Sequence, residues 1–242
     1  YRDFTINSMA VPLDSLEQNT RTSIIDPLHG RKALQEKCLH CCPDAFTDDP
    51  LRMLRAYRLQ AELDFSLSAS CLEDIQKYRA TINNCAAERI LHEFERIMLS
   101  SRAAEVCKAM AKTGLLWFIL PELKDGVGVD QPGYHHEDVF GHSLLALRCA
   151  ERVIRKPLIY FGENADIIVE YLQSPRKRKN LLLAALLHDL GKPVTRSSGS
   201  AKGGRITFYN HDRVGKAMFE KIAARLRMSR VDTDFIGKAI EM

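Results

Sequence analysis

Apolar residues recur at helical spacing over most of this 242-residue chain, and few runs alternate as strands do. One such stripe, Leu51, Leu54 and Tyr57, follows Asp49-Pro50, a favourable helix start because an Asp can cap the first free amides. The spacing predicts further helices over roughly 86–99, 102–116, 142–154, 180–190, 214–228 and 235–242. Strand-like character is confined to 22–27 and 205–209. The sequence therefore predicts a mainly α fold.

Composition narrows the classes of protein that this chain can represent. Apolar residues make up 45% and charged residues 27%, and the longest apolar runs are too short to span a bilayer, so we expect no membrane protein. Seven cysteines, an odd and sparse set, favour reduced thiols and a cytoplasmic location. The net charge of +4 permits a polyanionic partner. Because Tyr1 opens the chain and no stop signal follows the last predicted helix, we expect a fragment.

Asp49 and Arg52 lie three residues apart at a predicted helix start, so their side chains can project from one face. A carboxylate accepts hydrogen bonds and a guanidinium only donates them. Cytosine and adenine present an amino donor beside a ring-nitrogen acceptor, whereas uracil and guanine reverse this order. The pair can therefore accept C and A and reject U and G. A helix cap with a surface ion pair is the alternative interpretation.

A second group of residues follows a boundary that we place in the Gly- and Pro-rich stretch 126–133. His142 lies on one predicted helix, and His188-Asp189 end another. Two imidazoles and a carboxylate can bind a hard or borderline metal that activates water for attack on a phosphate ester. A buried, hydrogen-bonded histidine at a helix end is the alternative.

Four blocks occur in a fixed order in the first hundred residues, namely Arg2–Ala10, Asp26–Leu34, Asp48–Ala56 and Glu88–Ile90 followed by Glu93-Phe94. They closely resemble the second to fifth motifs of class II CCA-adding tRNA nucleotidyltransferases and bacterial poly(A) polymerases. The resemblance implies a remnant of an α/β nucleotidyltransferase head over 1–35 and a helical neck for nucleotide selection and RNA binding over 36–125. It also implies Asp49 and Arg52 as the protein template that reads the incoming base.

The same resemblance gives roles to other residues of the blocks. Arg2, Asp3 and Asn7 would lie at the nucleotide, the latter two near its ribose, and Asp26 and Gly30 would belong to a flexible loop. Arg55 and Arg58 would hold the nucleotide's phosphates or an RNA strand, or else cover a solvated helix face, and the helix at Glu88-Arg89 would support the neck. The family usually has Glu where this chain has Asp48.

The family's catalytic head also begins with a Gly-Ser motif and two aspartates that hold Mg²⁺. The sequence as given starts at Tyr1, with the second motif, and does not include this first motif. We therefore expect this chain to select a base without joining it to RNA.

Three further blocks, Tyr134–Leu144, His188–Lys192 and Phe208–Gly215, resemble the HD phosphohydrolase domain attached to bacterial CCA-adding, A-adding and CC-adding enzymes. The resemblance implies a helical HD domain over 133–242 with His142, His188 and Asp189 as ligands of a divalent transition metal. His211 would be a further ligand or a phosphate contact. The last HD aspartate cannot be assigned, and the resemblance is poor over the insertion 157–180.

Three functions stay open at this point. The first is CCA, CC or A addition from CTP and ATP to the 3′ end of tRNA, in the cytoplasm. The second is poly(A) polymerase, which shares the motifs and differs in the RNA it extends. The third is a metal-dependent phosphohydrolase with a nucleotide-binding scaffold. Two weaker signals are a zinc site at Cys38, His40, Cys41 and Cys42, for which reduced cysteines are the favoured alternative, and an RNA contact at the basic run 176–179.

Overall fold

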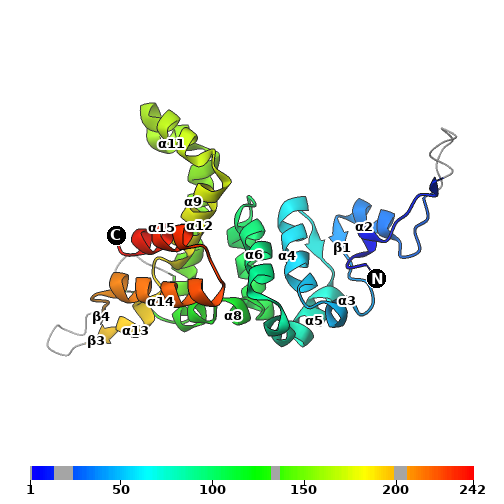
Figure 1. The fold of residues 1–242 in the computed structure, drawn as a ribbon, viewed down its shortest axis with the longest axis horizontal. Coiled ribbons are helices and arrows are strands. Elements are labelled where there is room, and N and C mark those ends of the chain that lie inside the picture. Colours follow the sequence, from blue (N-terminus) through cyan, green and yellow to red (C-terminus); the bar gives the residue numbers. More distant parts are fainter. Residues whose placement is uncertain (1, 14–23, 132–136, 199–205) are drawn as a thin grey trace.

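The computed structural model describes residues 2–13, 24–131, 137–198 and 206–242. It is mainly helical, as the sequence predicts, and elongated, with the N-terminal segments at one end and the C-terminal helices toward the other (Figure 1). None of the described helices combines the length and the apolar character that crossing a membrane requires.

The first half of the chain is a set of helices built on a short N-terminal segment. Its elements are η1 (Thr5–Asn7), α2 (Gly30–Glu36), β1 (Cys38–Leu39), α3 (Ala45–Asp48), α4 (Arg52–Leu63), β2 (Ser66–Leu67), α5 (Ala69–Tyr78), η2 (Arg79–Asn84), α6 (Ala87–Met98), α7 (Ala103–Thr113), α8 (Leu116–Ile119) and η3 (Pro121–Gly126). The parallel pair β1–β2 places Cys38 opposite Ser66. Gly114, in a left-handed conformation, ends α7 earlier than the predicted limit of 116.

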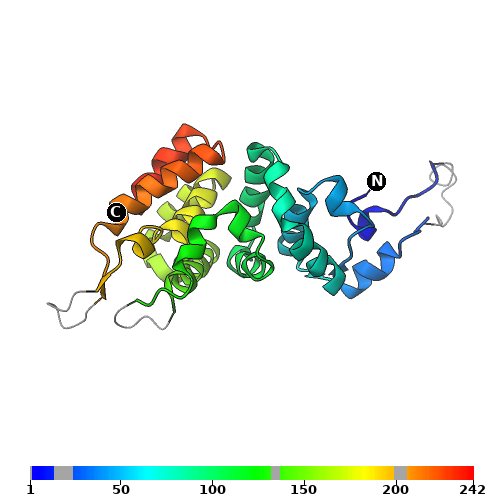
Figure 2. The ribbon, with the colours of Figure 1, turned by 90° about the horizontal axis from the view of Figure 1, so that it is seen from below.

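The second half packs a further group of helices against α6 and α7 (Figure 2). Its elements are α9 (Val139–Arg155), α10 (Pro157–Phe161), η4 (Gly162–Asn164), α11 (Ala165–Leu172), α12 (Pro175–Leu187), α13 (Lys192–Thr195), β3 (Ser197–Ser198), β4 (Ile206–Thr207), α14 (His211–Arg225) and α15 (Arg230–Ile240). The predicted insertion is thus helical: α10 and α11 project from the body with Leu158, Ile159 and Ile167 largely exposed (Figure 1).

One apolar core runs through both halves, from Phe4 to Ile240. Tyr57 lies fully buried in it, and its hydroxyl pairs with that of Thr113 at 2.7 Å. Burial raises the pKa of Tyr57 to about 12. At the opposite end of α7, the carboxylate of Glu151 on α9 accepts a hydrogen bond from the Ala104 amide at 3.1 Å. This contact ties the two halves at the first turn of α7, where free amides need acceptors.

The predicted basic run 176–179 opens α12, and its members do not form a uniformly solvated surface. Lys179 is buried and pairs with Glu95 of α6 at 2.6 Å, and Arg176 pairs with Asp232 of α15 at 2.6 Å. Asp232 also accepts a hydrogen bond from the side-chain amide of Asn180 at 2.7 Å. The run therefore joins α12 to its neighbours, a role that its sequence does not suggest.

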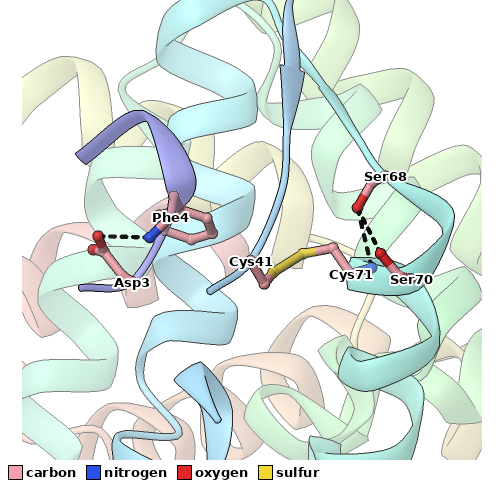
Figure 3. The surroundings of a disulfide bond; sticks show 6 residues. All are labelled: Asp3, Phe4, Cys41, Ser68, Ser70 and Cys71. Atoms are coloured by element: carbon pink, nitrogen blue, oxygen red, sulfur yellow. Dashed lines mark hydrogen bonds between the residues drawn. A yellow bond between two sulfur atoms is a disulfide. The ribbon is translucent and has the colours of Figure 1, made fainter. Parts of the chain in front are cut away.

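Cys41 and Cys71 form a disulfide that links the segment after β1 to α5, with their Cα atoms 5.7 Å apart (Figure 3). Phe4 pairs with Cys41 across an isolated β-bridge, so the bond lies beside the N-terminal segment. The expectation of reduced cysteines is wrong for this pair. Cys38, Cys42, Cys85, Cys107 and Cys149 are free thiols.

Candidate functional site

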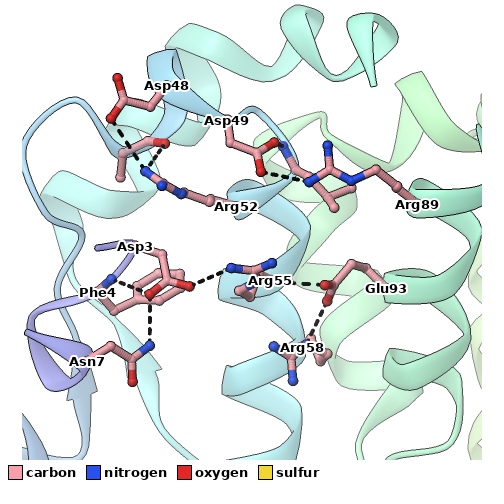
Figure 4. A network of polar contacts seen from close by, with 12 residues as sticks. Asp3, Phe4, Asn7, Asp48, Asp49, Arg52, Arg55, Arg58, Arg89 and Glu93 are labelled. Atoms are coloured by element: carbon pink, nitrogen blue, oxygen red, sulfur yellow. Dashed lines mark hydrogen bonds and ion pairs between the residues drawn. The ribbon is translucent and has the colours of Figure 1, made fainter. Parts of the chain in front are cut away.

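The predicted base-reading residues meet at the start of α4, but they do not pair with each other (Figure 4). Asp49 lies between α3 and α4; one carboxylate oxygen accepts the Leu51 amide at 3.1 Å and the other accepts Arg89 of α6 at 2.8 Å. The Arg52 guanidinium donates to the carbonyl of Ala45 at 3.2 Å and lies 3.7 Å from the Asp48 carboxylate. Each reading group is thus held by partners outside the pair.

A second layer of polar contacts lies one turn farther along α4 (Figure 4). Buried Asp3 accepts hydrogen bonds from Asn7 at 2.8 Å and from Arg55 at 2.9 Å. Burial alone would raise the pKa of Asp3, but these bonds outweigh it and lower that pKa. Arg55 also lies 3.7 Å from the carboxylate of Glu93 on α6. Arg55 therefore connects the N-terminal segment to both α4 and α6, while Arg2 is exposed.

The position of Arg58 fits neither a phosphate or RNA contact nor a solvated helix face, the two alternatives that the sequence leaves open. Arg58 is 8% exposed, and its guanidinium donates to Glu93 at 2.6 Å and to Glu62 at 2.9 Å. A guanidinium buried between two carboxylates neither covers a solvated face nor reaches a phosphate. The basic face of α4 therefore ends at Arg55.

Gly30 is the first residue of α2, and Asp26 precedes the helix by four residues. The Asp26 carboxylate accepts the amides of Arg31 at 3.0 Å and Gly30 at 2.6 Å, and these bonds lower its pKa although burial opposes them. A Cβ at position 30 would collide with the carbonyl oxygen of Thr5, so glycine lets α2 approach η1. The predicted strand over 22–27 is limited in the described residues to a bridge between Ile25 and Ala10, and residues 14–23 lie outside the described part.

The second predicted group also comes together. His142 on α9, His188 at the end of α12 and Asp189 after it have ligand atoms within 4.8 Å of one another. Asp189 is 2% exposed, and its Oδ2 lies 3.6 Å from Nε2 of His142 and 3.2 Å from Nε2 of His188. His211, the first residue of α14, has its Nε2 3.8 Å from Oδ1 of Asp189.

The hydrogen bonds behind these rings determine which nitrogen is available. Nδ1 of His188 lies 2.9 Å from the carbonyl of Ala185, and Nδ1 of His211 lies 2.8 Å from the carbonyl of Phe208. A carbonyl oxygen only accepts, so each Nδ1 carries the proton. In the neutral ring Nε2 then has the lone pair that can bind a metal, and in the protonated ring the Nε2–H of His188 can donate to Asp189. Two imidazole nitrogens and a carboxylate are ligands that suit a divalent transition metal. The residues present therefore fit such an ion.

Charge at this cluster is shared between Asp189, His188 and Lys192. Lys192 lies 2.8 Å from Oδ2 of Asp189 and donates to Gln131 at 2.6 Å. Burial alone would raise the pKa of Asp189, but the bonds to His188 and Lys192 outweigh it and lower that pKa to about 2. Burial likewise opposes protonation of His188, yet Asp189 raises the pKa of that imidazole. Asp189 is thus fully ionised at neutral pH.

Gly191 allows this arrangement to form. A Cβ at that position would overlap the carbonyl oxygen of His211 and crowd the amide of Gly215. Only glycine therefore lets the turn after Asp189 pack against the first turn of α14, which brings His211 to the cluster.

Sequence reasoning missed two residues of these sites. Arg89 holds Asp49, and Lys192 holds Asp189. Both residues lie inside the motif blocks that carry the family resemblance. Their place in those blocks was the signal in the sequence that could have pointed to them. The predicted histidine-containing block from Tyr134 begins outside the described residues, which omit 132–136.

Comparisons with known proteins match two parts of the chain to known families. Residues 64–126 match the family model described as "Probable RNA and SrmB- binding site of polymerase A", and residues 139–241 match the HD domain. The chain is 32% identical over 237 residues to the A-adding tRNA nucleotidyltransferase of Deinococcus radiodurans, covering 96% of this chain and 48% of that protein. The chain is thus similar to tRNA nucleotidyltransferases, and its second half matches the HD domain.

Other relatives agree. The multifunctional CCA protein of Hahella chejuensis is 32% identical over 234 residues, covering 92% of this chain and 47% of that protein. The chain thus spans about half the length of the curated relatives it matches. Among solved structures, a tRNA-processing enzyme (apo form I) matches with a TM-score of 0.60 at 19% identity, over 98% of this chain and 51% of that one. A tRNA nucleotidyltransferase complexed with a primer tRNA and an incoming ATP analogue matches with a TM-score of 0.52 at 19% identity, over 99% and 70%. These structures share the fold.

Proposed function

We propose that this chain is the base-selecting and RNA-binding part of a tRNA 3′-end nucleotidyltransferase, followed by an HD domain. The parent reaction transfers CMP and AMP from CTP and ATP to tRNA in the cytoplasm. The proposed parts are a head remnant over 1–35, a neck over 36–125 and an HD domain over 133–242. Mg²⁺ would serve the head carboxylates of the family, and Asp3 and Asn7 would lie at the ribose.

The observation that carries this proposal is the donor and acceptor capacity left at Asp49 and Arg52. A carboxylate accepts about four hydrogen bonds, and Asp49 uses two, one from Leu51 and one from Arg89. A guanidinium has five N–H groups, and one from Arg52 is engaged with Ala45. Asp49 can therefore accept from the amino group of C or A, while Arg52 donates to the adjacent ring nitrogen.

Titration of CTP, ATP, UTP and GTP into the chain by calorimetry tests the proposal. We expect CTP and ATP to bind at least about tenfold more tightly than UTP and GTP, because UTP and GTP leave the acceptors of Asp49 and the donors of Arg52 unpaired. Equal affinity for all four would contradict it.

These residues accept C and A alike, so they do not separate CCA addition from poly(A) synthesis. We assign tRNA as the substrate because the relative from Deinococcus radiodurans is by name an A-adding tRNA nucleotidyltransferase. A tRNA lacking its CCA end should therefore bind more tightly than generic single-stranded RNA of the same length. The reverse order would favour the poly(A) polymerase.

The cluster of His142, His188 and Asp189 supports a second, metal-dependent function for the HD part. A bound transition metal would supply an activated water for attack on a phosphate ester. The chain's own residues would hold that ion: His188 with Nε2 turned inward, and Asp189 kept ionised by Lys192. We expect 2′,3′-cyclic AMP to be hydrolysed to adenosine 2′- or 3′-monophosphate when Ni²⁺ or Mn²⁺ is added. This activity should be lost in His188→Ala. Activity unchanged by that substitution would contradict the assignment.

A further inference from the structure

A cavity of about 430 Å³ lies between α7 and α9, and its described lining residues belong to neither site above. Trp117 of α8 and Phe140 of α9 form part of its wall, and their rings meet edge to face with centroids 5.1 Å apart. Both side chains are half-buried. Trp117 stands in the apolar run 115–120, a pattern that predicts a core residue. In the structure it lies at the wall of a cavity.

Three cations surround this aromatic wall. Lys108 and Lys112 are one turn apart on α7, and Arg148 faces them from α9. All three are exposed, and none takes part in a salt bridge with any residue that the structure describes. Positive charge from two helices is thus concentrated around one opening.

Two carboxylates also line the cavity, and one of them is bonded to backbone amides. Asp138 caps α9: its oxygens accept the amides of Gly141 at 2.6 Å and Gly128 at 2.7 Å. Its charge is therefore directed at backbone donors. Glu137 is exposed. The three cations outnumber the single carboxylate that is not engaged by the backbone.

We propose that this α7–α9 cavity binds an unstacked nucleotide of a single-stranded RNA segment. The base would stack on Trp117 and Phe140, and the flanking phosphates would lie at Lys108, Lys112 and Arg148. Aromatic rings bind any base through its face, and cations set along a groove track the backbone. The volume suits one nucleotide. This inference rests on the proposed function in one respect, namely the identity of the RNA that is bound.

The cavity extends beyond the residues that match the RNA-binding family model. That match ends at residue 126, so it includes α7 and α8, whereas Phe140 and Arg148 lie in the part matched by the HD domain. An RNA strand held here would contact both parts at once. The HD domain would then take part in binding RNA whether or not it hydrolyses anything.

Trp117 makes the test direct, since it is the only tryptophan in the chain. We expect a tRNA transcript lacking its CCA end to quench Trp117 fluorescence saturably. The double variant Lys108→Glu/Lys112→Glu should bind that transcript at least about tenfold more weakly. Its slope of log affinity against log salt should fall by about 0.7 for each phosphate that the variant no longer neutralises. Trp117→Leu, followed by filter binding, should weaken binding about tenfold.

The matched control is Lys221→Glu/Lys238→Glu, which makes the same change of charge at exposed positions of α14 and α15. We expect it to retain wild-type affinity within about threefold. Equal weakening by both double variants would overturn the proposal, as would quenching by ATP without quenching by tRNA. The selectivity of Asp49 and Arg52 for CTP and ATP is measured separately, so either inference can fail while the other stands.

Discussion

Asp232→Asn is expected to lower the free energy of unfolding by about 3–5 kcal/mol at neutral pH, because it breaks a buried network of charges. Asp232 is 6% exposed and is bonded to Arg176 and Asn180, while the Lys179 ammonium lies 3.4 Å away. An uncharged amide leaves the buried Lys179 with Glu95 as its remaining partner. Urea unfolding at pH 7 measures the loss.

Asp234→Asn on the same helix is the matched control. Its ion pair with Arg230 is 3.9 Å long and exposed, so its loss should cost less than about 0.5 kcal/mol. Equal stability of the two variants would show that the network around Asp232 contributes little.

The pH dependence of this effect has a defined direction. Burial alone would raise the pKa of Asp232, but hydrogen bonds from Arg176, Asn180 and Ser229 outweigh it and lower that pKa. A group whose pKa is depressed in the folded state stabilises that state above its unfolded pKa, about 4 for an aspartate. The contribution is lost as pH falls through the folded pKa. The difference between wild type and Asp232→Asn should therefore shrink progressively below about pH 4.

Asp189→Asn is expected to weaken binding of Ni²⁺ or Mn²⁺ at the HD cluster by at least about 100-fold. Loss of an outer-shell partner alone costs about 10–100-fold in metal affinity, and a direct ligand costs no less. The substitution also removes the carboxylate toward which His142 and His188 both turn their Nε2 atoms. Competition with a chromophoric chelator measures the affinity.

Asp166→Asn, an exposed position on α11, is the control for the loss of one carboxylate and should bind metal as the wild type does. Unchanged affinity in Asp189→Asn would contradict the proposed ligand set and would leave His188 and His211 as hydrogen-bonded histidines only.

The sequence predicts the mainly helical fold and the meeting of His142 with His188 and Asp189 because local periodicity and short motifs carry that information. It does not predict contacts that depend on how helices cross. Arg89 reaches Asp49 from forty residues away, and nothing between them marks the pair. Arg58 reads as a surface cation by spacing, yet packing places it between Glu93 and Glu62.

The same limit explains the α7–α9 cavity and the disulfide. Lys108, Lys112 and Arg148 come from two helices whose approach is set by tertiary packing, including the bond between Glu151 and Ala104. Cys41 meets Cys71 because β1 and β2 pair in parallel, a pairing of two residues each that is too short to leave a sequence pattern.

The central claim is that residues at the start of α4 read the base, and the most direct test is to compare nucleotide selectivity in wild type and Arg52→Ala. We expect the preference for CTP and ATP over UTP and GTP, at least about tenfold in wild type, to disappear in Arg52→Ala because the ring nitrogen loses its donor. Arg96→Ala on α6, which removes an exposed arginine paired with Glu62, should keep the preference. A preference for CTP and ATP that survives in Arg52→Ala would contradict the account.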